Sequence, residues 1–281
     1  MPSLTILLIR HGETEWNTRK SLQGHIDIPL NLTGHAQAVA TGSYIRTLVR
    51  GGTPAIVSSD LMRARATAEA IATALGSSAP LQLDARFRET HLGSWQGRSW
   101  EDVEATSGDD LSRWRREPDF PVPGGGESVR QRFARVVRAL HEAALRGGAA
   151  GVGVVIVAHG GVIDDIGRLV TSCPFGTATG LRKHNCSVST LHFEASAEAA
   201  SLAAAGDDSA LRAYVEAALP SETVEPHSAA SALGSWTIGE WGSIDHLEGL
   251  SAPALADPLA DSALFSGGEG VGESEERGRP A

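Results

Sequence analysis

The sequence predicts an α/β fold, a three-layer αβα sandwich in which helices cover both faces of a mostly parallel central sheet. Short apolar runs of strand length alternate along the chain with longer segments whose apolar residues recur every three or four positions. Most of these runs stop at glycine, serine or aspartate turns. The chain has 281 residues, of which 41% are hydrophobic and 21% are charged. This composition can bury a core, and it excludes a wholly disordered chain.

The predicted strands are apolar runs too short for a helix. The first run ends at Arg10-His11-Gly12, which is typical of a buried strand that stops at a tight turn. The third run is rich in valine and apolar throughout, a pattern that indicates burial on both faces of a sheet. The runs are residues 4–9, 55–57, 151–158 and 187–193.

The predicted helices are marked by their capping residues. Thr33 is the predicted N-cap of the helix between the first two strands. Asp60 is the predicted cap of the next helix, which Gly76 ends. Ser128, followed three residues later by Gln131, gives the sequence pattern of a capping box at the start of a long helix.

Domain organisation follows from a change in composition after the last predicted strand. We expect residues 1–194 and 234–250 to form a single α/β domain that carries the functional site. Residues 195–233 are rich in Ala and Ser, so we expect either a solvated insertion or one weak helix, best placed at 210–219. Residues 251–281 are rich in Gly, Ser, Ala, Pro and Glu and are expected to form a disordered tail.

The charge and cysteine content exclude several classes of protein. Lys and Arg number 24 against 34 Asp and Glu, a net charge of −10, so we expect neither nucleic acid nor a membrane as partner. An anionic ligand would need a local positive pocket. Cys173 and Cys186 are too few for a disulfide framework. The start of the chain lacks the pattern of a signal peptide, and no apolar run approaches about 18 residues, so we expect a cytoplasmic protein.

Two separate predicted strands end in a histidine followed by a glycine, namely His11 and His159. Because parallel strands end at the same edge of a sheet, neighbouring strands would bring both imidazoles into one small space. Arg10 adds a guanidinium beside the first histidine, and Arg63 lies in the first turn of the helix behind the second strand. Guanidinium groups together with a helix N-terminus suit a phosphate dianion. A further helix is predicted directly after His159.

Residues 8–14, with the sequence Leu-Ile-Arg-His-Gly-Glu-Thr, resemble the signature of the histidine phosphatase superfamily, the phosphoglycerate-mutase-like proteins. Further segments fall in the order of that family, and residues 236–247 resemble its closing strand. The resemblance covers most of the chain outside 195–233 and the tail. The supporting segments are Gln23-Gly24, 29–34, 58–64, Arg88-Glu89, 93–97, 125–128 and 158–160.

The resemblance implies roles for five residues. His11 would be the nucleophile that takes the phosphoryl group as a phosphohistidine, while its other ring nitrogen donates to a backbone carbonyl. Arg10, Arg63 and His159 would bind the phosphate oxygens and stabilise the transition state. Glu89 would protonate the leaving oxygen and then activate water. For this double role we expect burial to raise the pKa of Glu89 toward neutrality.

The resemblance also implies contacts to the substrate from Asn17, which can add a neutral donor, and from Gln23, Gly24 and Gly160. We expect no metal ion and no cofactor, since the cationic side chains supply the charge that a phosphoryl group needs. The carboxylates of Asp164-Asp165 are expected on the helix behind His159, away from any metal site.

Residues 98–127 are left to cover the pocket. Trp95 and Trp100 are expected to pack beneath the site, and Glu127 to lie at a helix start. The same segment holds three arginines that would either bind a second anionic group of the substrate or lie in solvent: Arg113, Arg115 and Arg116.

Three functions stay open for such a site: a phosphomonoester hydrolase acting on a small phosphorylated metabolite, a phosphoglycerate mutase primed by a bisphosphoglycerate, and a non-catalytic protein that binds a phosphorylated ligand. Glu89 and His159 lie 70 positions apart, which resembles the shorter phosphatase branch of the family. The segment 22–25 also resembles phosphatase sequences. The intact set of five residues argues against a non-catalytic protein. We therefore predict a metal-independent phosphatase of the histidine acid phosphatase type.

Overall fold

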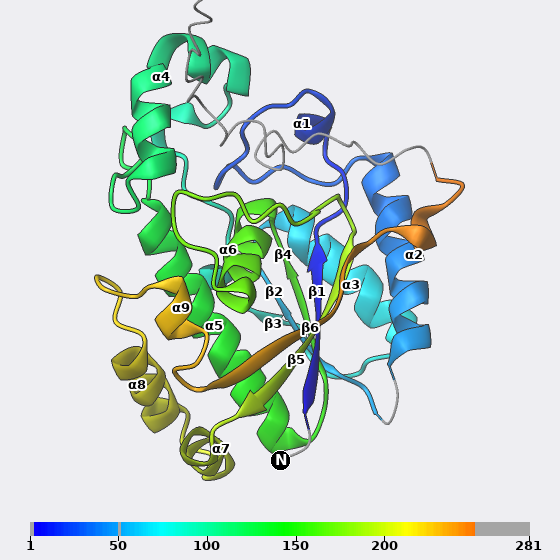
Figure 1. Cartoon of the computed structure of the whole chain (residues 1–281). Coiled ribbons are helices and arrows are strands. Elements are labelled where there is room, and N and C mark those ends of the chain that lie inside the picture. The colour runs from blue at the N-terminus through cyan, green and yellow to red at the C-terminus, as the bar shows by residue number, and fades with distance from the viewer. Residues whose placement is uncertain (1–2, 50–51, 251–281) are drawn as a thin grey trace, which may run out of the picture.

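One sheet forms the centre of the molecule. Within residues 3–49 and 52–250, which the computed structural model describes, six strands pair in the order β3-β2-β4-β1-β5-β6 (Figure 1). The predicted tail 251–281 lies outside the described residues. The strands are β1 (Leu4–Arg10), β2 (Ala55–Ser58), β3 (Gln82–Leu83), β4 (Val154–Ala158), β5 (Val188–Ala195) and β6 (Gly234–Ser243).

The strand directions confirm a mostly parallel sheet. The pairs β1–β4, β2–β4 and β2–β3 are parallel. The remaining strands form an antiparallel edge, because β5 runs against β1 and β6 runs against β5. The helices are α1 (Glu15–Thr18), α2 (Leu32–Leu48), α3 (Met62–Leu75), α4 (Trp100–Arg116), α5 (Val129–Ala150), α6 (Gly160–Thr171), α7 (Ala197–Ala204), α8 (Asp208–Ala218) and α9 (Pro226–Ala229).

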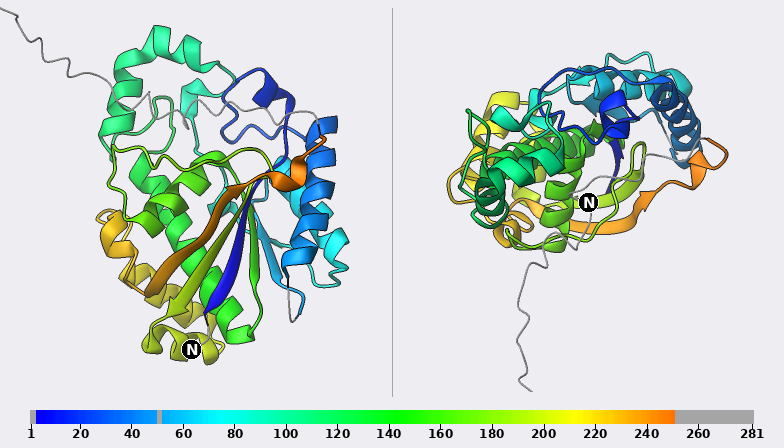
Figure 2. Two further views of the ribbon diagram at one scale, coloured as in Figure 1. Left: turned by 45° about the vertical axis from the view of Figure 1, so that its right-hand side comes forward. Right: turned by 90° about the horizontal axis from the view of Figure 1, so that it is seen from above.

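Helices cover both faces of the sheet, as the predicted three-layer sandwich requires. Figure 2 shows α2 and α3 on one side of the sheet and α5 and α6 on the other. Alternate side chains of β1 enter two separate cores, because successive residues of a strand point to opposite faces. Ile6 and Leu8 pack with α5 and α6, whereas Leu7 and Ile9 pack with α2 and α3. No helix in the described ranges has both the length and the apolar character needed to cross a membrane.

Two of the predicted helix ends are confirmed in detail. The Ser128 hydroxyl accepts a hydrogen bond from the backbone N–H of Gln131, and the Gln131 side chain accepts one from the backbone N–H of Ser128. This reciprocal capping box starts α5. Gly76 ends α3 in the left-handed conformation, which glycine adopts without a steric cost.

Two predicted N-caps are wrong. Asn31 rather than Thr33 caps α2, because its side chain accepts a hydrogen bond of 2.8 Å from the backbone N–H of Gly34. The N-cap residue of α3 is Leu61, which has no capping side chain, and the backbone N–H of Met62 donates instead to the Asp27 carboxylate at 2.7 Å. The Asp60 carboxylate pairs instead with the guanidinium of Arg88 at 2.6 Å, a partner that is distant in sequence.

The segment 195–233 is more structured than predicted. It forms α7, α8 and α9, which pack on α5 and α6, so the expectation of a solvated insertion is wrong. α8 lies at the place given for the one expected helix, 210–219, but it is one of three helices in this segment. Leu211, Val215 and Leu219 recur every four residues and are buried in the same core as α5. Their spacing gives α8 one apolar stripe, and the small alanines around them allow close packing.

A third apolar cluster supports residues 98–127, the segment predicted to cover the pocket, which we call the cap. Trp95, Trp100, Val103, Leu111 and Trp114 are buried in it, so Trp95 and Trp100 pack as predicted. In Figure 1, α4 and α1 lie above the end of the sheet at which β1 and β4 stop. The cap is thereby placed over the carboxyl ends of the central strands, where open α/β sheets bind their ligands.

Candidate active site

The two strand-terminal histidines meet at this edge. Arg10, the last residue of β1, pairs in register with Ala158, the last residue of β4. The next residues, His11 and His159, therefore leave the sheet side by side, and their ring centroids lie 5.1 Å apart. Parallel pairing of two neighbouring strands is thus what brings together side chains 148 positions apart in the chain.

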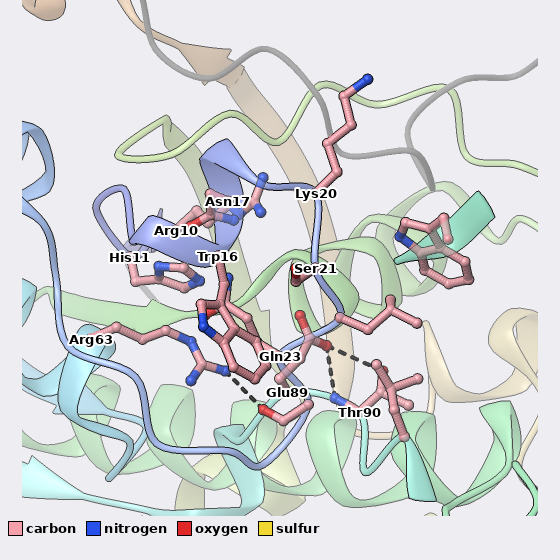
Figure 3. Close-up of a pocket in the computed structure, with 14 residues that line it drawn as sticks. Arg10, His11, Trp16, Asn17, Lys20, Ser21, Gln23, Arg63, Glu89 and Thr90 are labelled. Carbon is pink, nitrogen blue, oxygen red and sulfur yellow. Dashed lines mark hydrogen bonds between the residues drawn. The ribbon is translucent and has the colours of Figure 1, made fainter. Parts of the chain in front are cut away.

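A small cavity of about 70 Å³ opens in front of His11 (Figure 3). Ligand pockets that enclose a whole drug-sized molecule measure about 300–1,000 Å³, so this cavity suits a group the size of a phosphoryl group. Of the predicted site residues, Arg10, His11, Asn17, Gln23, Gly24, Arg63 and Glu89 line it. The lining residues without a predicted role in binding are Trp16, Lys20, Ser21, Leu22, Thr90, Leu92 and Trp100.

His11 is held with one ring nitrogen toward the backbone. Its Nδ1 lies 2.7 Å from the carbonyl oxygen of Gly12, to which a protonated Nδ1 donates. This tautomer leaves an unprotonated Nε2, the state that a nucleophile needs. Burial, followed by the positive charges of Arg63 and Arg10, holds the pKa of His11 well below its usual value. The ring therefore stays neutral in mildly acidic solution.

The two guanidinium groups are fixed by backbone carbonyls. Arg63 is fully buried and donates from Nη2 to the Gly24 carbonyl at 2.9 Å and from Nη1 to the Ile26 carbonyl at 3.0 Å. Arg10 donates from Nη1 to the Lys183 carbonyl at 2.7 Å. Burial lowers the pKa of Arg63 to about 10, so it remains charged at neutral pH. The carbonyl partners of Arg63 are neutral and leave its positive charge available to an anion in the cavity.

His159 and Gly160 stand behind the cavity rather than in its lining. His159 is fully buried, and its Nε2 lies 2.8 Å from the Ser59 hydroxyl, at the end of β2. Burial, together with the charge of Arg63, holds the pKa of His159 well below its usual value. Gly160 is the first residue of α6.

Glu89 differs from the sequence prediction in its charge state. Its Oε1 accepts hydrogen bonds from Thr90 N at 2.7 Å and Thr90 Oγ1 at 3.1 Å, and its Oε2 accepts one from Gly161 N at 3.2 Å. Burial raises the pKa of Glu89, but the charges of Arg132 and Arg63 and these backbone donors outweigh it, so the pKa is lowered overall. The expected shift toward neutrality is therefore wrong for the free protein, in which Glu89 is a carboxylate.

The predicted neutral contacts have distinct local roles. The Asn17 side-chain oxygen accepts hydrogen bonds from Thr14 N and Oγ1 at the start of α1, so its amide nitrogen is the atom left to donate to a ligand. Gln23 is buried and lines the cavity, and its Oε1 has no hydrogen-bond partner among the described residues. Gly24 holds Arg63 through its carbonyl and adopts a left-handed φ of 52°, which favours glycine.

Several supporting residues were not found from the sequence. Arg132 pairs with Asp165 in a buried bidentate ion pair of 2.7 and 2.9 Å and donates to Thr90 Oγ1 at 2.7 Å. Asn185 donates from its amide nitrogen to the His11 carbonyl at 2.9 Å. Arg132 lies on the apolar stripe of its helix, and a charged residue at such a position is the sequence signal that could have revealed it.

The other charged candidates are occupied elsewhere. Glu127 pairs with Arg135 and accepts a hydrogen bond from the backbone of His91, so it fastens the loop that carries Glu89. Asp164 lies on α6 as predicted and binds Lys183 at 3.0 Å. In the described part of the chain, no group of three or more His, Cys, Asp or Glu side chains could hold a metal ion.

The arginines of the cap do not line the cavity. Arg113 forms an exposed ion pair with Glu117 at 3.1 Å, and Arg116 donates to the backbone of its own helix. The guanidinium of Arg115 lies 5.8 Å from the centre of the Trp100 ring. A second anionic group of a substrate would therefore meet other side chains first.

The comparisons with known proteins agree on one family. A family model described as the histidine phosphatase superfamily (branch 1) matches residues 6–205. A glucosyl-3-phosphoglycerate phosphatase of Mycolicibacterium vanbaalenii is 40% identical over 163 residues, which are 56% of this chain and 70% of the relative. A probable phosphoglycerate mutase GpmB of Klebsiella pneumoniae is 36% identical over 198 residues, 69% of this chain and 86% of the relative.

A solved structure agrees with these sequence matches. The native structure of a mycobacterial glucosyl-3-phosphoglycerate phosphatase superposes with a TM-score of 0.63 at 25% identity. The superposition covers 86% of this chain and 100% of the other.

Proposed function

Because the chain belongs to branch 1 of the histidine phosphatase superfamily, we propose that it hydrolyses phosphomonoesters of small metabolites through a phosphohistidine at His11. One observation carries the proposal: a neutral histidine with an available Nε2 borders a cavity that two buried guanidiniums and a carboxylate also line. A phosphoryl group needs in-line attack on one side, positive charge around its oxygens and a proton for the leaving group. This cavity gathers groups suited to each of these three tasks.

The first step transfers the phosphoryl group. As the ester binds, Glu89 takes up a proton from solvent. His11 Nε2 attacks phosphorus, the bond from phosphorus to the ester oxygen breaks, and the carboxyl of Glu89 gives this proton to that oxygen as the alcohol leaves. Arg10 and Arg63 bind the phosphoryl oxygens, where negative charge persists in the transition state. The Asn17 amide nitrogen is a further donor toward the same oxygens, while His159 lies beside His11 and outside the cavity lining. Glu89 ends the step as a carboxylate.

The second step returns the enzyme to its starting state. The Glu89 carboxylate takes a proton from water as the water oxygen attacks phosphorus. The bond between phosphorus and Nε2 breaks, inorganic phosphate forms, and His11 regains its neutral ring. Glu89 returns its proton to solvent as the phosphate leaves. We propose that the reaction needs no metal ion, because the guanidiniums supply the positive charge that a metal would otherwise bring.

The leaving group of the substrate lies at the rim of the cavity. Trp16, Lys20 and Trp100 are the lining residues placed to meet it. A relative is named glucosyl-3-phosphoglycerate phosphatase, and we propose this ester as the first substrate to test. A sugar ring can pack on an indole, and Lys20 can attract a carboxylate. The two cysteines are free, which agrees with the proposed cytoplasmic location.

The test compares the wild type with His11→Ala on para-nitrophenyl phosphate in the presence of EDTA. We expect a loss of at least about a thousandfold in kcat, because the phosphoryl acceptor is gone. His35→Ala, which alters an exposed histidine of α2, is the matched control and should retain full activity. Hydrolysis that persists in His11→Ala would refute the assignment of the nucleophile, and loss of wild-type activity in EDTA would refute metal independence.

Phosphoglycerate mutase activity is the second candidate, since a relative from Klebsiella pneumoniae is named a probable phosphoglycerate mutase. The two activities differ in whether water or a second substrate oxygen takes the phosphoryl group from His11. Interconversion of 2- and 3-phosphoglycerate, with bisphosphoglycerate added, measures the mutase. Turnover faster than the hydrolysis of any ester in a panel of phosphorylated metabolites would favour the mutase.

A further inference from the structure

We propose that the buried Arg132–Asp165 pair is a positioning device for Glu89, which fixes the direction of its carboxylate and sets the pH range in which it can act as an acid. The inference rests on the proposed phosphatase function. It concerns two side chains that do not line the cavity and that therefore act through Glu89 rather than on the substrate.

The pair is connected to Glu89 by a short chain of hydrogen bonds. Asp165 on α6 holds the guanidinium of Arg132 on α5 by two bonds of 2.7 and 2.9 Å. The remaining nitrogen of Arg132 donates to Thr90 Oγ1 at 2.7 Å. Because that hydroxyl accepts from Arg132, its own proton is directed to Glu89 Oε1, 3.1 Å away. Figure 3 shows the contacts of Glu89 with Thr90.

The pair is rigid because it is buried. Both side chains are almost fully inaccessible, and all three guanidinium nitrogens of Arg132 have acceptors. An ion pair in such surroundings is expensive to desolvate and adds little to stability compared with apolar side chains of similar size. The role that the geometry supports for the pair is therefore its effect on the neighbouring carboxylate rather than a contribution to folding.

The charges that face Glu89 come from several elements. Arg132 on α5 is the largest charge that lowers the pKa of Glu89, and Arg63 on α3 adds to it. His11 and His159 border the same space, but burial keeps both rings neutral. Arg132 is thus the cation that can be removed without touching the groups proposed to bind phosphate.

The backbone of Glu89 is held by a separate set of groups. Its carbonyl oxygen accepts hydrogen bonds from Arg135 at 2.9 Å and from His25 Nε2 at 2.8 Å. The charge of Arg135 is matched by Glu127, with which it pairs, and burial lowers the pKa of His25. Arg132 takes no part in these contacts, so a change in a variant at Arg132 is expected to report on the carboxylate.

The chemical consequence concerns the leaving group. An ionised Glu89 must gain a proton before it can protonate the leaving oxygen of an alkyl ester. Hydrolysis of alkyl phosphates therefore declines as the pH rises above the pKa of Glu89. A nitrophenolate leaves without that proton. Arg132 therefore confines the hydrolysis of alkyl phosphates to lower pH, while it scarcely affects the hydrolysis of aryl phosphates.

The experiment compares pH profiles of kcat/KM for an alkyl and an aryl phosphate. Arg132→Met/Asp165→Leu removes both charges together and leaves no unpaired buried ion. For this variant we expect the alkaline limb of the pH profile of kcat/KM with the alkyl phosphate to move up by about one pH unit. The reason is that a nearby opposite charge typically depresses a carboxyl pKa by about 1–3 units. The aryl phosphate should change by less than about threefold. The ionisation of the substrate is the same for all variants and cancels in the comparison.

Two further variants separate this role from a general loss of structure. Arg132→Lys keeps the charge and should leave the limb near that of the wild type. Arg130→Met removes a neighbouring arginine of α5 that pairs with Asp119 and Glu225, and it should shift nothing. Thr90→Val breaks the connecting hydroxyl and should shift the limb in the same direction by less. It carries the test if the double variant does not fold.

A measurement without turnover keeps this inference distinct from the proposed function. The carboxyl carbon resonance of Glu89, assigned by its absence in Glu89→Gln, gives the pKa directly by NMR titration. A higher pKa of Glu89 in Arg132→Met/Asp165→Leu than in the wild type supports the inference. Equal pKa values in folded proteins, or an equal shift in Arg130→Met, would overturn it. Absence of hydrolysis by the wild type would instead refute the proposed function.

Discussion

Replacement of Gly161 by alanine should disturb the site through a single carbon atom. A β-carbon at this position, the second residue of α6, would lie closer than 3.0 Å to Glu89 Oε1 and 3.0 Å from Thr90 Oγ1. Ordinary contacts of a β-carbon begin at 3.4 Å. The carboxylate of Glu89 would therefore have to withdraw by about 1 Å, and its hydrogen bond from the Gly161 N–H would be lost.

The expected effect is on activity and not on folding. A misplacement of about 1 Å in a catalytic group costs about a hundredfold in rate, so Gly161→Ala should lower kcat/KM for alkyl phosphates by about that factor. The loss for para-nitrophenyl phosphate should be smaller, because its leaving group needs no proton. Alanine is the better helix former, so α6 is not weakened by the intrinsic preference of the new residue.

The assay measures kcat/KM for both esters together with the urea midpoint of unfolding. Gly148→Ala on α5 is the matched control, since among the described residues nothing lies within 4 Å of its β-carbon position. It should retain full activity. A Gly161→Ala protein that hydrolyses alkyl phosphates within about threefold of the wild type would show that Glu89 has no role that depends on its position.

Three more predictions follow from the charges. The neutral state of His11 predicts that kcat for an aryl phosphate stays within about threefold from about pH 7 to about pH 5, and a loss that follows the usual histidine titration would contradict it. Burial lowers the pKa of His141 to about 4. The stability that depends on its neutral ring is therefore present above about pH 6.5 and is lost as the pH falls toward 4, and we expect the unfolding free energy to fall by about 3 kcal/mol over this range. His141→Gln, which can still bond Trp236, should remove this part of the pH dependence in urea titrations. Glu142→Gln should cost about 3 kcal/mol of unfolding free energy at unchanged kcat, because Glu142 is fully buried and pairs with Arg86 at 2.6 Å, and a change below about 1 kcal/mol would contradict it.

The parts of the fold that could be predicted are those with a local cause. The strand β1 and the turn after it are visible because an apolar run and a glycine turn are properties of adjacent residues. Ser128 and Gln131 likewise carry their capping box within four positions. The N-cap of α2 was assigned to Thr33 although Asn31 lies two residues earlier, because both residue types can cap a helix and the choice depends on where the chain turns.

The parts that could not be predicted depend on pairing across the fold. Asp60 has the local sequence pattern of an N-cap, yet its carboxylate pairs with the guanidinium of Arg88, 28 positions away. The low content of large apolar residues in segment 195–233 predicts a solvated insertion. The burial of this segment depends instead on the spacing of a few apolar residues that pack against α5. The pKa of Glu89 was predicted from burial alone, and its direction reverses because Arg132 reaches it from another element.

Positive charges impose opposite conditions on the two reacting groups before substrate binds. Together with burial, Arg63 and Arg10 keep the His11 ring unprotonated, which a nucleophile requires. Arg132 and Arg63 keep Glu89 ionised, which an acid cannot use. A bound phosphate monoester would bring negative charge into this space and offset Arg63, the charge common to both groups, so the field that opposes protonation of Glu89 would weaken. On the proposed mechanism, the carboxyl gains its proton when an ester occupies the cavity. In an acidic chain with a net charge of −10, the buried arginines would then both attract the phosphoryl group and couple acid catalysis to its arrival.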